Sequence, residues 1–419
     1  MEKFSLLILG VLFSWSIKAQ EGNFITGGVY DKATGKPLVS ASVYYVQNQK
    51  ATITNAEGEF LIEKPADADS LVIAYVGYAT KKYSILTAIP PKIYLDPSEI
   101  NLAEVVVLPW DVNNFVRRIW EKYNEIYEKE SNTTNNKYLF FYRQITKTDT
   151  HYNEFIECFF AADNTFNVGS HFSFRESRFA KIASDSIITF TFTNFFLYST
   201  FSPFYQKNPS KNRFNTFLQS NFETIYDIEV ENRFFTEENG DIIVLNFIPK
   251  KKAKEKLTLA WGKLYIRELD LAIIRIEGIS NNKIENLSAQ VKFFGKVAKV
   301  LGKVSDSHFS FTINYKDGTD GYPHVEAINC TQDFTINFWF EKGKHKMHIT
   351  STLFAVGPDT NPPKEQKTAK TGNLLDIVQQ MEYHPDFWKN NPIVKRTKVD
   401  EEIIKSFDNV NAFGTFKPE

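Results

Sequence analysis

Hydrophobic and polar residues alternate with a period of two along residues 24–107, in short runs separated by turn-forming residues. Val43 and Tyr45 fall on one face of such a run, and Phe60 and Ile62 repeat the pattern further along. A period of two is typical of strands that bury one face, and the Gly, Pro, Asn and Asp residues between the runs favour tight turns. The pattern predicts about six or seven short strands, an arrangement typical of a small β-sandwich.

The spacing of apolar residues changes to that of a helix between Val112 and Tyr127. Asp111 precedes this stretch and can cap the helix, because its carboxylate can accept hydrogen bonds from the first free backbone N–H groups. We therefore predict a helical connector over residues 109–136, with one broad apolar face that packs against a core.

Beyond this connector the period of two returns in longer runs, with hairpin-type turns at residues 238–241 and 317–321. Long strands joined by short turns predict an antiparallel sheet of roughly nine or more strands over residues 137–357, strongly curved or closed on itself. The predicted strands cover residues 138–146, 154–161, 242–248, 263–268, 272–279, 287–294, 308–315, 325–340 and 347–356. The remainder, 358–419, is predicted to be a polar linker at 358–372 followed by tail helices at 373–382 and 400–407.

The first 19 residues have the composition of a secretory signal peptide. Lys3 gives a positive start, residues 4–17 are largely apolar, and the small residue Ala19 stands where cleavage is expected. The apolar stretch is short for a membrane span, so an uncleaved anchor is the weaker alternative. We predict that residues 1–19 are removed on export and that the first folded domain covers residues 20–108.

Composition narrows the class of protein. A chain of 419 residues with 42% hydrophobic and 24% charged residues is globular and suits two domains plus a tail. The net charge of −1 gives no general attraction for nucleic acid, and we predict no nucleic-acid partner. Cys158 and Cys330 leave two alternatives open, a disulfide or two buried free thiols. Two cysteines cannot supply a disulfide scaffold or a cysteine zinc cluster.

Five short motifs follow one another near the N-terminus: Gly27-x-Val29-x-Asp31, Thr34-Gly35-x-Pro37-Leu38, Ala41-x-Val43, Thr54-Asn55-x-x-Gly58-x-Phe60 and Val76-Gly77-Tyr78. In this order they resemble the carboxypeptidase-regulatory-like domain, a transthyretin-like sandwich. Residues 102–107 resemble the join that follows this domain in Gram-negative envelope proteins, among them TonB-dependent outer-membrane receptors. The resemblance implies a periplasmic or outer-membrane-associated location. The chain is too short for the plug and barrel of such a receptor, and the domain supplies no peptidase active site.

Together these patterns predict a fold that is mainly β with a few helices, in which the transthyretin-like β-sandwich is followed by a larger curved antiparallel β-sheet domain. Within that second domain, residues 261–266 and 271–273 are similar to the strand repeats of lipoprotein-carrier folds. That similarity implies a curved sheet that shelters an apolar ligand.

Aromatic residues are concentrated between residues 190 and 205. The alternation holds only at the start of this segment, so aromatic side chains are expected on both of its sides. They are either part of a Phe-rich core, or they line a site for an apolar ligand, a membrane or a partner. The candidate binding residues are Phe192, Phe195, Phe196, Tyr198, Phe201 and Phe204.

A few residue pairs have the spacing of known metal sites, but we predict no catalytic or metal site from them. His151 and Glu154 have the spacing of a zinc pair, but a strand or turn does not present both as ligands. His345 and His348 are expected on opposite faces of a strand. The sequence contains no nucleophile elbow, dinucleotide loop or phosphate-binding loop, and we predict no metal and no cofactor. The basic run at 250–256 is predicted to be a solvated loop, with contact to anionic lipid headgroups as the alternative.

Three hypotheses on function remain. The first is a non-enzymatic envelope protein that acts in binding or assembly, with an envelope protein, an apolar ligand or the outer-membrane surface as its partner. The second is a hydrolase with dispersed active-site residues, for which the acids Glu154, Glu157 and Glu176 near Arg143 and Arg175 are candidates. The third is an outer-membrane β-barrel, which predicts an outward apolar band with aromatic girdles. We expect the first, because no catalytic spacing is present in the sequence.

Overall fold

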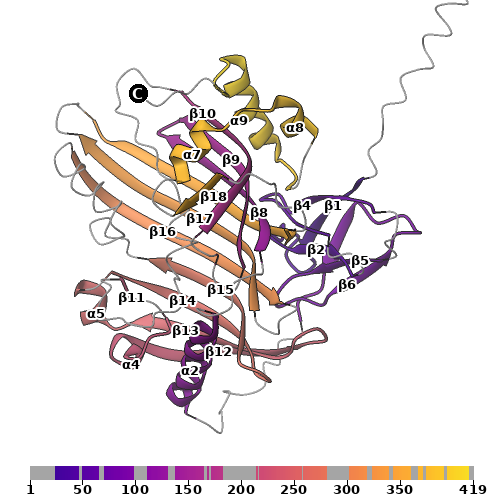
Figure 1. Ribbon diagram of the computed structural model, residues 1–419. Helices are drawn as coiled ribbons and strands as arrows, with labels where there is room; N and C mark the ends of the chain where they lie inside the picture. The colour runs from indigo at the N-terminus through magenta and orange to yellow at the C-terminus, as the bar shows by residue number, and fades with distance from the viewer. Residues whose placement is uncertain are drawn as a thin grey trace, which may run out of the picture.

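The computed structural model shows a protein built mainly of β-strands (Figure 1). The predicted signal peptide and the predicted strand at 287–294 lie outside the described residues. The structure describes residues 24–46, 50–65, 70–98, 111–130, 137–164, 168, 171–182, 214–215, 217–256, 258–280, 302–318, 323–338, 343–359, 367–370, 374–390 and 394–414.

The N-terminal part is a sandwich of two small sheets, which confirms the fold predicted for it. One sheet has the strand order β4-β1-β7 and the other the order β3-β2-β5-β6. Alternate residues such as Val29, Val43, Phe60 and Ile73 are almost fully buried between the sheets. The strands are β1 (Phe24–Asp31), β2 (Ser42–Tyr45), β3 (Ala51–Ile53), β4 (Glu59–Glu63), β5 (Ser70–Ala74), β6 (Lys81–Ser84) and β7 (Lys92–Leu95).

The larger part is a twelve-stranded sheet with the order β12-β13-β14-β15-β16-β17-β18-β8-β9-β10-β19. Along this order neighbouring strands are antiparallel, as predicted, and β11 pairs in parallel with β14 outside it. The strands are β8 (Lys137–Thr148), β9 (His151–Asp163), β10 (His171–Lys181), β11 (Phe214–Asn215), β12 (Tyr226–Thr236), β13 (Gly240–Pro249), β14 (Thr258–Arg267), β15 (Ala272–Ser280), β16 (Gly302–Asp317), β17 (Pro323–Phe338), β18 (His345–Pro358) and β19 (Lys367–Lys370). Strands β10, β11, β12 and β19 were not predicted.

Other elements pack against parts of both faces of the large sheet. In β8, Phe140 and Tyr142 point to a core that also contains Tyr123 of α2 (Val112–Glu130) and one residue of α7 (Leu374–Gln380). Phe141 and Ile145 point to the opposite face, as expected from the alternation of a strand. That second face packs against the N-terminal sandwich and against α8 (Pro385–Asn390) and α9 (Lys398–Asn409). The sheet therefore joins the N-terminal and C-terminal parts of the chain on one of its faces.

Three predictions about the connections are wrong. The basic run forms a short helix, α5 (Lys251–Lys256), and the linker expected at 358–372 contains β19. No helix was predicted between the tail helices at 373–382 and 400–407, yet α8 begins at Pro385, because proline is well tolerated at the first position of a helix. A further short helix, α4 (Phe222–Ile225), precedes β12. Among the described residues, no helix is both long and apolar enough to cross a membrane.

Cys158 and Cys330 are both buried and are not joined in a disulfide, which decides between the two alternatives left by the sequence. Cys158 lies on β9 and Cys330 on β17, and two strands, β18 and β8, lie between them. Neighbouring strands are about 4.8 Å apart, so three such steps separate the residues by about 14 Å. A disulfide requires Cα atoms within about 7 Å. The cysteines therefore contribute as small apolar core residues.

Candidate functional site

A cavity of about 400 Å³ lies between the N-terminal sandwich and the large sheet. Strand β2 and residues 74–80 form one wall, and the β12–β13 turn, β15, β16 and the start of β17 form the other. Its lining is rich in tyrosine, including Tyr44, Tyr75 and Tyr78. A cavity of this size at a domain interface, with aromatic walls and a few polar groups, is typical of a small-molecule site.

Glu326 is placed in the cavity by an irregularity of β17. Asn314 of β16 pairs with Ala327 and the next residue, Tyr315, pairs with Val325, so Glu326 is the extra residue of a β-bulge. Bulges turn a side chain away from the regular alternation and are common beside functional sites. The Glu326 carboxylate accepts a hydrogen bond of 2.7 Å from the Ser42 hydroxyl of the sandwich.

The environment of Glu326 favours its neutral form. Burial raises the pKa of the Glu326 carboxyl above its ordinary value, and the nearby Glu238 carboxylate acts in the same direction. The Lys316 cation and the Ser42 hydroxyl oppose this rise but do not cancel it. The charges and hydrogen bonds that the protein offers therefore stabilise ionised Glu326 only in part.

Glu238 comes from the turn between β12 and β13 and joins the two walls. Its Oε1 accepts a hydrogen bond of 3.3 Å from Tyr44, and its Oε2 accepts one of 3.1 Å from Thr80. Burial, followed by the Glu238 charge, raises the pKa of the Tyr44 hydroxyl, which therefore stays protonated and donates. The carboxylates of Glu238 and Glu326 are thus both bound by hydroxyl groups of the sandwich.

Other polar contacts fix the two walls around the cavity. The Arg275 guanidinium lies 4.8 Å from the centre of the Tyr75 ring and donates a 2.9 Å hydrogen bond to the Tyr75 hydroxyl. Asn314 donates to the Ser40 carbonyl at 3.3 Å, and Asn329 donates to the Ser40 hydroxyl at 2.6 Å. The sandwich is therefore docked on the sheet through side chains of both parts.

With Glu326 ionised, the formal charges that line the cavity sum to −1. Three carboxylates, Glu238, Asp317 and Glu326, face two cations, Lys316 and Arg267. Arg267 is already paired, with Asp270 and Asp317 at 2.9 and 2.8 Å. With Glu326 ionised, the remaining negative charge favours a ligand that carries positive charge.

Comparison with known families identifies the domain that forms the N-terminal wall of the cavity. The family model of the CarboxypepD_reg-like domain matches residues 25–107. Residues 25–107 are a CarboxypepD_reg-like domain. The resemblance seen in the sequence motifs is thereby confirmed for this part of the chain. A search of curated proteins found no match to the chain.

Solved structures similar to the chain resemble it only weakly. A LolA superfamily protein from Nitrosomonas europaea is 10% identical, with a TM-score of 0.18, and the match covers 59% of this chain and 94% of that one. A DUF1329 family protein from Desulfovibrio piger is 11% identical, with a TM-score of 0.19 and coverages of 59% and 95%. The structure of MucB in complex with MucA(peri) matches at 7% identity and a TM-score of 0.17, covering 58% and 94%. TM-scores this low support no inference about ligand or partner.

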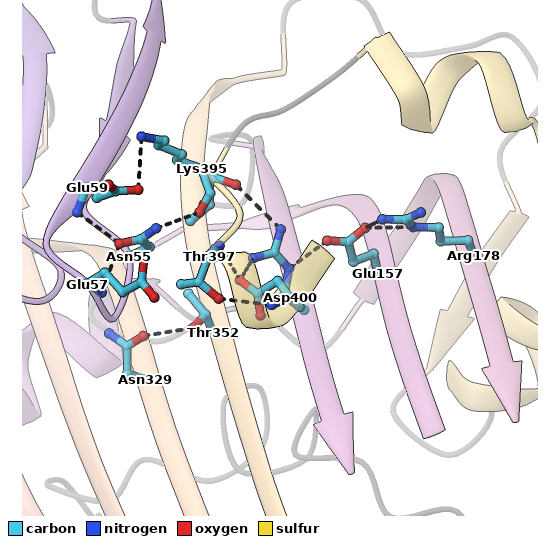
Figure 2. A network of polar contacts seen from close by, with 12 residues as sticks. Asn55, Glu57, Glu59, Glu157, Arg178, Asn329, Thr352, Lys395, Thr397 and Asp400 are labelled. Carbon is cyan, nitrogen blue, oxygen red and sulfur yellow. Dashed lines mark hydrogen bonds and ion pairs between the residues drawn. The ribbon is translucent and has the colours of Figure 1, made fainter. Parts of the chain in front are cut away.

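The acids proposed from the sequence do not form one site. Glu157 does lie beside Arg143, as expected, but it also pairs with Arg178 and is buried between the two arginines (Figure 2). Glu154 is on the opposite face of β9, in hydrogen-bonding contact with Gln144 at 3.4 Å. The remaining two candidates are used separately, since Glu176 contacts His384 at 2.9 Å and Arg175 pairs with Asp359.

The other candidates from the sequence give no site in the described residues. Within these, no group of three or more His, Cys, Asp or Glu residues is placed to hold a metal ion. His345 and His348 contact different aspartates, Asp149 and Asp333. The aromatic candidates Phe192, Phe195, Phe196, Tyr198, Phe201 and Phe204 lie outside the described residues.

The residues of the cavity were not predicted from the sequence. The one local signal is at Val325-Glu326-Ala327-Ile328, where an acid stands in an otherwise apolar stretch. A bulge at this point explains the pattern, because it lets both Glu326 and Ala327 occupy the same side of β17.

Proposed function

We propose that the protein is a non-enzymatic binding protein of the Gram-negative envelope, and that the cavity beside the CarboxypepD_reg-like domain holds its ligand. The observation that carries this proposal is the cavity itself, which both parts of the chain build and into which a bulge turns Glu326. The signal-like N-terminus and the domain resemblance support the envelope location. Recovery of the mature chain from the cytosol would contradict that location.

The chemistry of the cavity favours a small ligand with a protonated amine or guanidinium. Such a group would complete the partners of the Glu326 and Glu238 carboxylates, and it would offset the net negative lining. Tyrosine rings add attraction, because their faces carry negative partial charge toward a cation. An anionic ligand would instead add to the repulsion among three carboxylates.

A second candidate function is hydrolysis, and one observation favours it. Glu326 has a raised pKa and lies close enough to Glu238 for the two charges to interact, which is a pattern found in acid–base catalysis. The two proposals predict different results. A hydrolase would convert a substrate and would lose this activity when Glu326 is replaced, whereas a binding protein shows no turnover. We favour binding, because both carboxylates already accept hydrogen bonds from the sandwich.

Hexylammonium, hexanol and hexanoate are matched probes for the charge preference of the cavity. We expect hexylammonium to bind at least about tenfold more tightly than the other two in isothermal titration calorimetry, and Glu326→Gln to remove about that advantage. Glutamine keeps the shape and the acceptor for Ser42 but lacks the charge. Glu229→Gln, at an exposed position of β12, is the matched control and should change nothing. Equal affinities for the three probes, or tighter binding of hexanoate, would refute the proposed ligand class.

Binding of hexylammonium should weaken as the pH falls. The pKa of Glu326 is raised, so the carboxylate becomes protonated at a higher pH than an ordinary glutamate and loses its attraction for the cation. Titrations from neutral pH downward should show this loss beginning above the ordinary value of 4.5. In Glu326→Gln the remaining affinity should stay nearly constant over the same pH range. If the affinity of the variant fell with pH as steeply as that of the wild type, Glu326 would be excluded as the titrating group.

A further inference from the structure

The C-terminal residues 394–400 lie between the CarboxypepD_reg-like domain and the large sheet (Figure 2). On the domain side, the Asn55 side chain donates a 3.2 Å hydrogen bond to the carbonyl of Lys395. Its Oδ1 accepts hydrogen bonds from the backbone N–H groups of Glu57 and Glu59, at 3.0 and 2.9 Å. The Lys395 ammonium also pairs with Glu59 at 2.9 Å. Asn55 therefore stabilises the hairpin turn of the Thr54-Asn55-x-x-Gly58 motif, and the same turn binds the C-terminal segment.

On the sheet side, Arg143 of β8 binds the same segment. Its guanidinium pairs with Asp400 at 3.3 Å and donates a 3.4 Å hydrogen bond to the carbonyl of Val394. Asp400 also belongs to the capping box of α9, in which it accepts from the Thr397 backbone N–H at 2.8 Å and donates its own N–H to the Thr397 hydroxyl at 3.0 Å. Because Glu157 bonds Arg143 at 2.6 Å, the arginine is held in place from within the sheet.

Apolar contacts close the same junction. Ile53 of the domain, Trp388 and Val394 of the C-terminal part, and Phe159 of β9 belong to one buried cluster. Their exposed fractions are 4% or less. All three parts of the chain therefore meet in a buried apolar contact beside the polar one.

We propose that residues 394–400 are a latch that holds the CarboxypepD_reg-like domain in a fixed orientation on the sheet. The path from the latch to the cavity is short, because β3, which precedes Asn55, pairs with β2 through Ile53 and Ser42. Ser42 and Tyr44 of β2 then bind the two cavity carboxylates. Release of the latch loosens this wall of the cavity. The inference concerns the orientation of the domain and holds whether or not the cavity binds a cation.

Hydrogen exchange of the full chain tests the latch without any ligand. In Asp400→Asn, the backbone amides of residues 50–60 should exchange about tenfold faster, although the polar contacts of Asp400 are with Arg143 and Thr397, while the core of the domain around Val29 keeps its protection. The control is Lys405→Ala on the exposed side of α9, which should leave residues 50–60 unchanged. Faster exchange confined to α9 would show that Asp400 is only a helix cap, and uniform acceleration would show global destabilisation. Either result would overturn the latch.

A charge exchange across the domain side gives a second test with little risk of unfolding, because Lys395 and Glu59 are only partly buried. Glu59→Lys and Lys395→Glu should each speed exchange at residues 50–60 about threefold, as expected for a partly exposed pair. The double variant should restore the wild-type rate. A double variant no slower than the single ones would contradict the proposed contact.

Discussion

Replacing Glu157 by glutamine is expected to lower the free energy of unfolding by about 3–5 kcal/mol. Glu157 is 1% exposed and bridges two arginines, Arg143 and Arg178, which its charge neutralises in part. The Arg178 guanidinium also lies 5.0 Å from the centre of a Trp388 ring, so it cannot move to water without breaking the packing of α8. Removal of the carboxylate leaves Arg143 with Asp400 at 3.3 Å and takes the Glu157 charge away from buried Arg178, and this is costly because a buried cation needs a counter-charge.

Urea unfolding of Glu157→Gln measures this loss, with exposed Glu402→Gln as the control. The pKa of Glu157 is lowered from 4.5 to about 2 by the neighbouring arginines, although burial alone would raise it. Its contribution to stability is therefore complete above the unfolded value and is lost as the pH falls toward about 2. The wild type should lose more stability in this range than the variant, because the variant lacks the contribution of Glu157. A loss below about 1 kcal/mol at neutral pH, the range of exposed pairs, would show that the network is not buried as described.

Gly262→Ala is expected to lower the free energy of unfolding by about 3 kcal/mol, because strain and overpacking act together. Gly262 has φ +140°, and an added Cβ would lie 2.2 Å from the Glu277 carbonyl oxygen on the neighbouring strand. The carbonyl belongs to the β14–β15 ladder and cannot move away without breaking it.

Gly240→Ala is the matched control for this variant. Gly240 also has a positive φ, of +67°, but a Cβ there would meet nothing within 4 Å. This variant should cost only the backbone strain, about 1 kcal/mol. Equal losses for the two variants in thermal or urea unfolding would contradict the close approach of β14 and β15.

Local patterns predicted the N-terminal sandwich and most strands of the sheet, because alternation and turn residues act over a few positions. Two strands were missed for identifiable reasons. In β10 a bulge between Phe174 and Glu176 interrupts the alternation. In β12 another bulge, between Val230 and Asn232, does the same, and this edge strand carries Asp227 and Glu229 on its exposed side. Edge strands often carry charged side chains, because these prevent pairing with the strands of other chains. The same charges interrupt the hydrophobic pattern by which a strand is predicted.

The candidate site was predicted far less well, because distant parts of the chain build it. Arg143 and Glu157 were grouped only under the hydrolase hypothesis, and they pair because β8 and β9 form a hairpin. Ser42 and Glu326 are 284 positions apart, and no local pattern indicates that they meet. The contact depends on how the CarboxypepD_reg-like domain docks on the sheet, which tertiary packing decides.

A crystal structure of the full chain with hexylammonium tests the central claim most directly. The account predicts that the ligand occupies the cavity between the two parts, with its nitrogen within hydrogen-bonding distance of the Glu326 or Glu238 carboxylate. An empty cavity at saturating hexylammonium, or the ligand bound elsewhere, would contradict it.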